Sequence, residues 1–412
     1  MNQQQITKSG LSKIKSGHPW LFVTDLSKKF RISNRAGAVY FSDQWWLYSP
    51  KSFLRLRRFG PVAKKWMYNS QFNFLSNSDH FYDYFGSWLT EHMTQTLLKK
   101  IKALEIKNES EDCCLRWIFS ENDLIPGLIV DIFGDQVVCQ INSAPIELFW
   151  LHLKKCLIGS YISVLGREPQ VLEVRNSSVR SKEGLEIINH DFLHEPVALR
   201  WNGFKWLMTP AGPQKTGAYF DQRLNHKLNL EVAKKFNYQQ AWDLCCYQGG
   251  FGLHLLAAGL EVVAIDQSAA ALEVAKKNVL LNGLSLKSIE FVKSDVFDWL
   301  NDQVDKNKKT DLIILDPPSF VKSREKLSSA VRGYVQLNTL ALKSLRPGGA
   351  LFTCTCSQQI TTHLFDEILK DSAEKAGVRY KLINSTGQSP DHAAIENFPE
   401  GNYLNAKILL IE

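Results

Sequence analysis

The sequence predicts a multi-domain α/β protein whose C-terminal half is built on an open, doubly wound parallel sheet. The chain has 412 residues, which is too long for one ordinary domain. After about residue 197, short apolar segments alternate with helical patterns, as they do in a parallel sheet wound by helices. The first 72 residues instead show short segments rich in β-formers. We therefore expect a small β-barrel over residues 1–72, a central α+β domain over 73–196 and the wound sheet over 197–412.

The N-terminal segment carries the whole positive surplus of the chain. Residues 1–72 hold thirteen lysines and arginines and two acids, a net charge of 13 − 2 = +11. The remaining residues sum to (49 − 13) − (42 − 2) = −4. The alternation of leucine and arginine from Leu54 onward places Arg55 and Arg57 on the face opposite the leucines, next to Arg58. Such a basic face suits a nucleic-acid backbone, and a solvated surface without a partner is the alternative.

The central segment shows regular structure but no catalytic set. Leu89, Met93, Leu97 and Ile101 are spaced by four residues and predict a helix over residues 88–104. Strands are expected at residues 114–119, 137–141 and 171–174, with a second helix over 146–159. We interpret this segment as a linking domain that shapes a substrate groove.

A glycine-rich turn organises the wound sheet. Residues 241–252 read AWDLCCYQGGFG, an apolar strand followed by the turn. Glycines let the backbone approach a ligand closely, although this spacing is not the GxGxxG of dinucleotide sites. The predicted ligand site includes Asp243, Cys245, Gly249 and Gly250, and an ordinary tight turn is the alternative. The helix ahead of the turn is predicted to bury Leu224, Leu228, Val232 and Phe236.

Three acids end successive strands of the wound sheet or their turns: Asp243, Asp266 and Asp295. Because ligands bind at the carboxyl ends of parallel strands, all three should face one crevice. Asp266 suits the two hydroxyls of a ribose, and Asp295, followed by Val296, suits an adenine amino group. Asp243 suits an ammonium group or the loop itself. Helix N-capping is the alternative for each acid.

Asp316-Pro-Pro-Ser-Phe320 follows a buried apolar strand. Pro317 and Pro318 fix the backbone and remove two N–H donors. Such a rigid turn can hold a flat base, with Asp316 aimed at its polar edge and Phe320 available for stacking.

Cys356 stands at the tip of the next predicted strand, beside Asp316. A thiolate at this position can add to C6 of a cytosine and make C5 nucleophilic enough to accept a methyl group. The alternative is an inert, buried thiol. Cys354 lies two residues deeper in the same strand, and we assign it to packing.

The composition argues against several other classes of protein. None of the eight cysteines forms a CxxC pair, and no Cys/His set has zinc spacing, so no metal is expected. Reduced thiols fit a cytosolic protein. No apolar run approaches the length of about 18 residues that a membrane span needs, and no secretory signal is visible. A homodimer is compatible with the sequence, which carries no information on oligomeric state.

The turn at residues 243–252 resembles that of S-adenosylmethionine enzymes, and the C-terminal part is similar to class I, Rossmann-like methyltransferases. The whole chain resembles the bacterial large-subunit ribosomal RNA cytosine-C5 methyltransferase I family, which has an RNA-binding PUA domain, a central domain and a catalytic domain. The matching stretches are Gly17-His-Pro-Trp20, Pro126-Gly-Leu-Ile-Val-Asp131, Gln214-Lys-Thr-Gly217, Asp221-Gln-Arg223, residues 243–252, residues 316–323, Thr355-Cys-Ser357 and residues 398–403.

The resemblance implies that Cys356 is the nucleophile and that Asp316 orients a cytosine of large-subunit ribosomal RNA. It also implies that Asp221, Arg223 and the strand-end acids surround S-adenosylmethionine. The family turn usually has Phe and Thr where this chain has Cys245 and Gln248. Two alternatives stay open: a guanine (N2 or N7) methyltransferase of the same fold without a covalent adduct, and a non-catalytic RNA-binding or ribosome-assembly factor.

Overall fold

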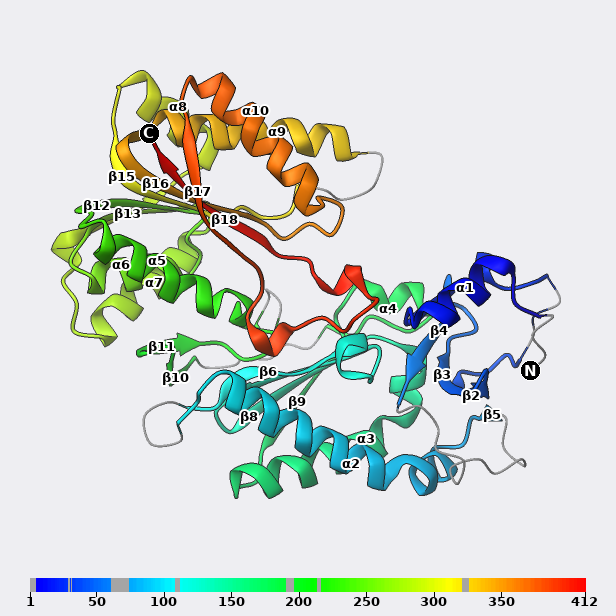
Figure 1. Cartoon of the computed structure of the whole chain (residues 1–412). Helices are drawn as coiled ribbons and strands as arrows, with labels where there is room; N and C mark the ends of the chain where they lie inside the picture. Colours follow the sequence, from blue (N-terminus) through cyan, green and yellow to red (C-terminus); the bar gives the residue numbers. More distant parts are fainter. Residues whose placement is uncertain are drawn as a thin grey trace. The chain divides into compact units, whose positions relative to one another are not determined.

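The computed structural model describes residues 5–28, 30, 32–60, 74–107, 112–189, 196–212, 216–320 and 326–412 (Figure 1). The chain divides into two compact units. The first comprises residues 1–201, 208–220 and 390–401, and the second comprises residues 202–207, 221–389 and 402–412. Four parts of the sequence predictions lie outside the described residues: the boundary at 72/73, Gln214, Lys215 and residues 321–323.

The first unit contains two sheets. An antiparallel sheet has the strand order β1-β4-β3-β2-β5, and a second sheet has the order β6-β7-β8-β9, in which only β8 and β9 are parallel. The elements are α1 (Lys8–Ser16), β1 (Trp20–Phe22), β2 (Gly37–Phe41), β3 (Gln44–Tyr48), β4 (Leu54–Phe59), β5 (Phe74–Leu75), α2 (Ser78–Ala103), β6 (Cys114–Phe119), β7 (Leu128–Phe133), β8 (Gln136–Ile141), α3 (Ala144–Leu165), β9 (Gln170–Val174), α4 (Val179–Lys182) and β10 (Val197–Trp201). The likeness of the first sheet to a PUA barrel stays a prediction.

The two sheets of this unit share one hydrophobic core. Trp45 of β3 lies 5.1 Å from Phe85 of α2, measured between ring centroids, and Phe59 of β4 lies 5.7 Å from Phe81. Removing the first 72 residues would therefore expose the core of the central segment.

The helix α2 begins at Ser78, ten residues earlier than the predicted helix. Asn77 caps it there by accepting from the backbone N–H groups of Asp79 and His80.

One helix of the first unit, α3, is long and apolar enough to cross a membrane, with a mean hydropathy of 1.2 over its most apolar window. A helix was predicted here over residues 146–159, and α3 extends beyond that prediction at both ends, over Ala144–Leu165. Its residues Phe149, Leu153, Leu157 and Tyr161 are fully buried in the core. Figure 1 shows it beside α2, and the two helices are in contact. We therefore interpret α3 as a core helix.

Residues 390–401 also belong to the first unit, which makes the second unit smaller than the predicted segment 197–412. The reason is a buried polar contact: Asp391 accepts from the backbone N–H of Arg116 at 2.9 Å. His18 and Trp20 pack edge-on against Phe398, with ring centroids 5.9 Å and 4.7 Å away. Two of the family-like stretches, 17–20 and 398–403, are thus in contact through these aromatic rings.

The second unit is built on a seven-stranded sheet with the order β14-β13-β12-β15-β16-β18-β17. Figure 1 shows α5, α6 and α7 on one face and α8, α9 and α10 on the other. The elements are β11 (Phe204–Met208), α5 (Arg223–Lys235), β12 (Gln240–Leu244), α6 (Gly250–Ala257), β13 (Glu261–Asp266), α7 (Ala269–Leu281), β14 (Ile289–Lys293), α8 (Val296–Asp305), β15 (Thr310–Leu315), α9 (Leu327–Lys343), β16 (Leu345–Thr355), α10 (Thr362–Ala376), β17 (Tyr380–Thr386) and β18 (Asn405–Ile411). The predicted doubly wound α/β architecture is confirmed.

Two details of this unit differ from the predictions. The strand β18 runs antiparallel to both β16 and β17, so only the first five strands form the expected parallel sheet. The helix α5 buries a polar face: Asn225, His226 and Asn229 are buried, whereas Leu224 is 45% exposed. Of the predicted apolar face, Val232 is buried and Leu228 and Phe236 are half-buried, so the hydrophobic spacing indicated the buried face of α5 only in part.

Candidate functional site

The turn between β12 and α6 is strained and closely packed. Cys245 and Tyr247 have left-handed backbones, with φ of 64° and 50°, and so does Gly249, with φ of 84°. A Cβ added to Gly250 would lie 2.7 Å from Nε2 of His226, so no side chain fits there. Strain of this kind at non-glycine residues costs about 1–3 kcal/mol each and concentrates at binding sites. We name residues 245–252 the glycine cradle, and their role in ligand binding stays a prediction.

Asp243 holds the cradle from beneath. Its buried side chain accepts from the backbone N–H of Gly252 at 2.7 Å, a donor in the first turn of α6 that has no partner within the helix. Burial raises the pKa of this carboxyl to about 7, and the charges of Asp316 and Asp266 act in the same direction. Of the two roles predicted for Asp243, the structure therefore favours the loop.

Replacing Asp243 by asparagine is expected to stabilise the ligand-free protein at pH 8. Because the folded pKa of about 7 lies above the ordinary pKa of an aspartate, about 4, wild-type stability falls as the pH rises between these two values. At 1.36 kcal/mol per unit, relief of this penalty is worth at most about 4 kcal/mol, and it vanishes below about pH 4. Urea unfolding between pH 4 and 8 measures it, with the exposed Asp305→Asn as control. A gain that does not depend on pH would contradict this interpretation.

Asp266 and Asp295 stand at the ends of β13 and β14, at the same edge of the sheet. Asp266 accepts from the backbone N–H groups of Tyr247 and Ser268 at 2.9 and 2.8 Å. Asp295 is the N-cap of α8, where it accepts from the N–H groups of Phe297 and Asp298, and Val296 after it is buried. A carboxylate has about four lone-pair sites, so each acid keeps the capacity to accept from a ligand.

Asp316 lies beside Cys354. The parallel register pairs Leu315 of β15 with Thr353 of β16, so the residues that follow them, Asp316 and Cys354, lie side by side. The Cys354 thiol lies 2.9 Å from Oδ1 of Asp316, and Nε2 of Gln222 donates to Oδ2 at 3.0 Å. The assignment of Cys354 to packing alone is therefore incomplete.

The double-proline corner follows Asp316. Pro317 is buried and Pro318 is exposed, as a turn that leaves the sheet requires. The ring of Phe320 instead packs inward, 4.7 Å from Tyr334 and 6.0 Å from Phe297 between centroids. This packing argues against the predicted stacking role of Phe320, because its ring already has aromatic partners in the hydrophobic core.

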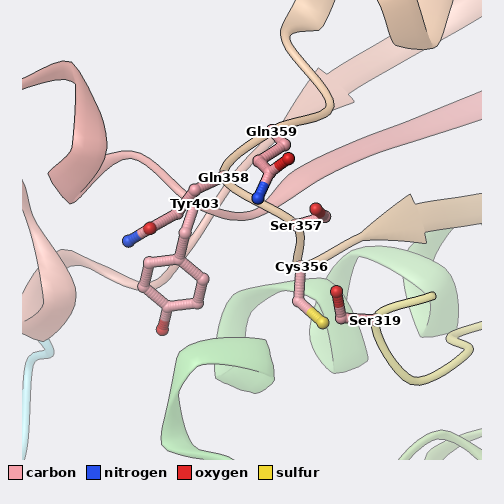
Figure 2. Close-up of a pocket in the computed structure, with 6 residues that line it drawn as sticks. All are labelled: Ser319, Cys356, Ser357, Gln358, Gln359 and Tyr403. Carbon is pink, nitrogen blue, oxygen red and sulfur yellow. The ribbon is translucent and has the colours of Figure 1, made fainter. Parts of the chain in front are cut away.

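Cys356 opens into a pocket of about 290 Å³. Figure 2 shows its sulfur directed toward Ser319 of the double-proline corner, with the Tyr403 ring across the pocket. The remaining lining residues are Ser357, Gln358 and Gln359. The thiol at the end of β16 thus shares a pocket with the corner after Asp316, as the sequence predicted.

Asp221 and Arg223 flank the start of α5, and both are buried. The Tyr403 hydroxyl donates to Oδ2 of Asp221 at 2.6 Å, which fixes the ring at the pocket. The backbone carbonyl of Arg223 accepts from Asn202 at 3.0 Å. Through Tyr403, Asp221 is connected to the Cys356 pocket.

Comparison with known proteins places this site in a family. A family model of S-adenosylmethionine-dependent methyltransferases matches residues 173–397. The ribosomal RNA large subunit methyltransferase I of Aeromonas salmonicida (strain A449) is 37% identical over 322 residues, which cover 75% of this chain and 79% of that protein. The protein of the same name from Citrobacter koseri is 33% identical over 402 residues, covering 94% and 93% of the two chains. The chain belongs to the ribosomal RNA large subunit methyltransferase I family.

A solved structure shows that the fold extends over the whole chain. A Streptococcus mutans protein described as a SAM-dependent methyltransferase has a TM-score of 0.74 and 17% sequence identity, covering 98% of both chains. The family makes this protein an S-adenosylmethionine-dependent methyltransferase. The glycine cradle follows β12 at the edge of the sheet where the acids that follow β13 and β14 also lie, and this arrangement fits that cofactor.

Replacing Asp266 by asparagine is expected to weaken S-adenosylmethionine binding by about 10-fold or more, since one hydrogen bond to a charged group is worth about 1.5–3 kcal/mol. Asparagine keeps one acceptor for the turn but loses the second oxygen and the charge. Calorimetric titration of the cofactor measures the effect, with the exposed Asp298→Asn as control. Unchanged affinity would show that Asp266 only supports the turn.

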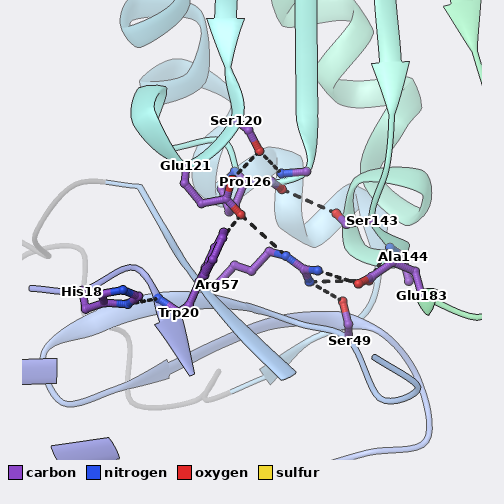
Figure 3. A network of polar contacts seen from close by, with 11 residues as sticks. His18, Trp20, Ser49, Arg57, Ser120, Glu121, Pro126, Ser143, Ala144 and Glu183 are labelled. Carbon is purple, nitrogen blue, oxygen red and sulfur yellow. Dashed lines mark hydrogen bonds and ion pairs between the residues drawn. The ribbon is translucent and has the colours of Figure 1, made fainter. Parts of the chain in front are cut away.

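The three arginines of β4 are not a free basic face. Figure 3 shows Arg57 between the two segments of the first unit, where its guanidinium contacts Glu183 at 2.5 Å and Ser49 at 3.1 Å. Arg58 donates to the carbonyl of Gly17, and Arg55 donates to that of Pro50. The prediction that these residues form the RNA-binding face is therefore corrected for Arg57, whose side chain is only 7% exposed.

Several residues of the site were not predicted as such. Tyr403 and Gln222 lie inside family-like stretches quoted from the sequence, and that was the signal available for them. Ser319 lies inside the quoted stretch 316–323, whereas Gln358 and Gln359 reach the pocket because of loop geometry, which no spacing in the sequence encodes. Within the described ranges, no group of three or more His, Cys, Asp or Glu residues is placed to hold a metal ion.

Proposed function

We propose that this protein methylates C5 of a cytosine in large-subunit ribosomal RNA, with Cys356 as the nucleophile. The observation that carries the proposal is the pocket that Cys356 shares with Ser319 of the double-proline corner. The names of the family relatives support ribosomal RNA of the large subunit as the substrate. A ribosomal RNA substrate also supports a cytoplasmic location.

The chemistry follows from the position of the thiol. Cys356 Sγ, as a thiolate, forms a bond to C6 of the base, and the displaced electron pair makes C5 nucleophilic. S-adenosylmethionine, when bound, supplies the electrophilic methyl group. Transfer of the C5 proton to water and cleavage of the Sγ–C6 bond, by elimination, then restore the C5=C6 double bond and the thiolate. The protein divides one difficult substitution into two easier steps.

Asp316 is suited to hold the base by its amino group. Its two carboxylate oxygens accept from the Cys354 thiol and the Gln222 amide, and these donors orient the carboxylate. An acceptor of this kind recognises the exocyclic NH₂ of cytosine. The Tyr403 ring, fixed by Asp221, offers a flat wall in the Cys356 pocket.

The RNA backbone needs basic residues other than Arg57. Lys8, Lys15, Lys28, Arg35 and Lys51 are exposed on the N-terminal segment, and these residues supply the phosphate contacts that the charge surplus of this segment predicts. A homodimer would repeat this surface, and the proposal does not require one.

The experiment that tests the function is mass mapping of methylated nucleotides in ribosomal RNA from cells with and without this protein. The expected result is one 5-methylcytosine in the large-subunit RNA that disappears in the deletion strain and returns with the wild-type gene. Loss of a methylated guanine instead would assign the protein to the guanine methyltransferases of the same fold.

A further inference from the structure

Cys354 is a buried thiol whose sulfur points at a functional carboxylate. It is fully buried in β16, and its Sγ lies 2.9 Å from Oδ1 of Asp316. We propose that Cys354 and Gln222 are positioning residues that hold the Asp316 carboxylate in the orientation required to receive the base. This inference rests on the proposed function and assigns a task to two residues that do not touch the substrate.

Gln222 is itself held by a chain of amides. Its Oε1 accepts from Nδ2 of Asn225 at 2.6 Å, and Oδ1 of Asn225 accepts from the Thr386 hydroxyl at 2.7 Å. Nδ2 of Asn225 also donates to the carbonyl of Gly387 at 3.3 Å. Gln222 and Asn225 are buried, so their amide groups have few alternative partners. The chain ties the orientation of Asp316 to the end of β17.

The two donors occupy different oxygens of one carboxylate. Cys354 binds Oδ1 and Gln222 binds Oδ2, which fixes both the torsion of the side chain and the direction of its remaining lone pairs. Cys354, Gln222 and Asn225 together form a clamp on Asp316. This clamp also explains why the buried face of α5 is polar, since Asn225 lies on that face. A helix selected only for packing would place leucines there.

The thiol is suited to act as a donor. Burial raises the pKa of the Cys354 thiol well above its ordinary value, and the charge of Asp316 raises it further. It therefore keeps its proton and donates, whereas Cys356 lies in the open pocket as the nucleophile. The two cysteines of the sequence Cys-Thr-Cys thus have separate tasks.

Substitution of Cys354 by valine or serine tests the clamp. Valine fills the volume without a donor, and serine keeps a donor. We expect Cys354→Val to lower kcat by about 10- to 100-fold, the range expected for one hydrogen bond to a charged group. Cys354→Ser should recover most of that loss. The dissociation constant for S-adenosylmethionine should stay within about threefold of wild type, because the ground-state cofactor contacts are unchanged.

The same pair of substitutions at Cys139 provides the matched control. Cys139 is fully buried in the core of the first unit, with Val130 on β7 and Glu173 on β9 as its register partners, so valine should be tolerated there at least as well as serine. Neither Cys139 variant should change kcat. If Cys354 serves only in packing, its variants should rank as those of Cys139 do: Cys354→Val should be active and Cys354→Ser impaired. That result would overturn the inference.

Cys356→Ala in the same assay separates this inference from the proposed function. If Cys356→Ala is inactive and Cys354→Val retains the wild-type kcat, the clamp is wrong and the covalent mechanism stands. If Cys356→Ala turns over normally, the covalent mechanism fails. The order of the Cys354 variants then still reports on the orientation of Asp316.

Discussion

Replacing Cys356 by alanine is expected to lower the methylation rate by roughly 10⁴-fold or more, the scale of losing a covalent nucleophile. The alanine variant keeps the pocket and the glycine cradle, so it should bind S-adenosylmethionine as wild type does. Single-turnover methylation of ribosomal RNA measures the rate. Turnover close to wild type would favour a guanine methyltransferase that works without an adduct.

A trapped adduct gives the same prediction a second, independent measurement. A fluorine at C5 of the target cytosine cannot leave as the C5 proton does, so the Sγ–C6 bond persists after methyl transfer. Wild-type protein should therefore form a covalent complex with RNA that carries 5-fluorocytidine, visible as a mass increase under denaturing conditions. The Cys356→Ala variant should form none. An adduct mapped to another cysteine would move the nucleophile away from the end of β16.

The sequence predicted the parts of this structure that local patterns encode. The positions of β12 to β16 follow from short apolar runs, and the acids at their ends follow from topology, since parallel strands finish at one edge. Cys356 was predicted for the same reason, as a reactive residue one position past a strand. The edge strand β17 was missed because most of it is exposed and its pattern is weak.

The failures share a physical cause. Leucine spacing predicted an apolar buried face for α5, but the helix turns Asn225 inward because Thr386 and Gly387, from a distant segment, bind it. Leu-Arg alternation predicted a basic surface on β4, but Glu183 lies 126 residues further along the chain and buries Arg57. A polar side chain is buried only where a hydrogen-bond or ion-pair partner meets it. The tertiary fold supplies that partner, so local sequence cannot predict the burial.

Replacing Arg57 by methionine is expected to destabilise the protein by about 3–5 kcal/mol, the range for removing one partner of a buried ion pair. The change would leave the Glu183 carboxylate, whose side chain is 1% exposed, without its nearest cation. Glu121, 3.7 Å from Arg57, would lose a positive neighbour as well, although Trp20 and Ser120 still donate to it (Figure 3). Urea unfolding gives the free energy, and the exposed Arg35→Met is the control that removes an equal charge.

The double variant Arg57→Met/Glu183→Gln should recover part of the loss, because a neutral amide is far less costly to bury than an unpaired carboxylate. RNA binding measured at several salt concentrations completes the test. If Arg57 is structural, the folded Arg57→Met variant keeps the wild-type salt dependence, whereas Arg35→Met reduces it. A weaker salt dependence with unchanged stability would return Arg57 to the RNA-binding face. The expected pattern instead makes Arg57 the residue that joins the basic N-terminal segment to the central one.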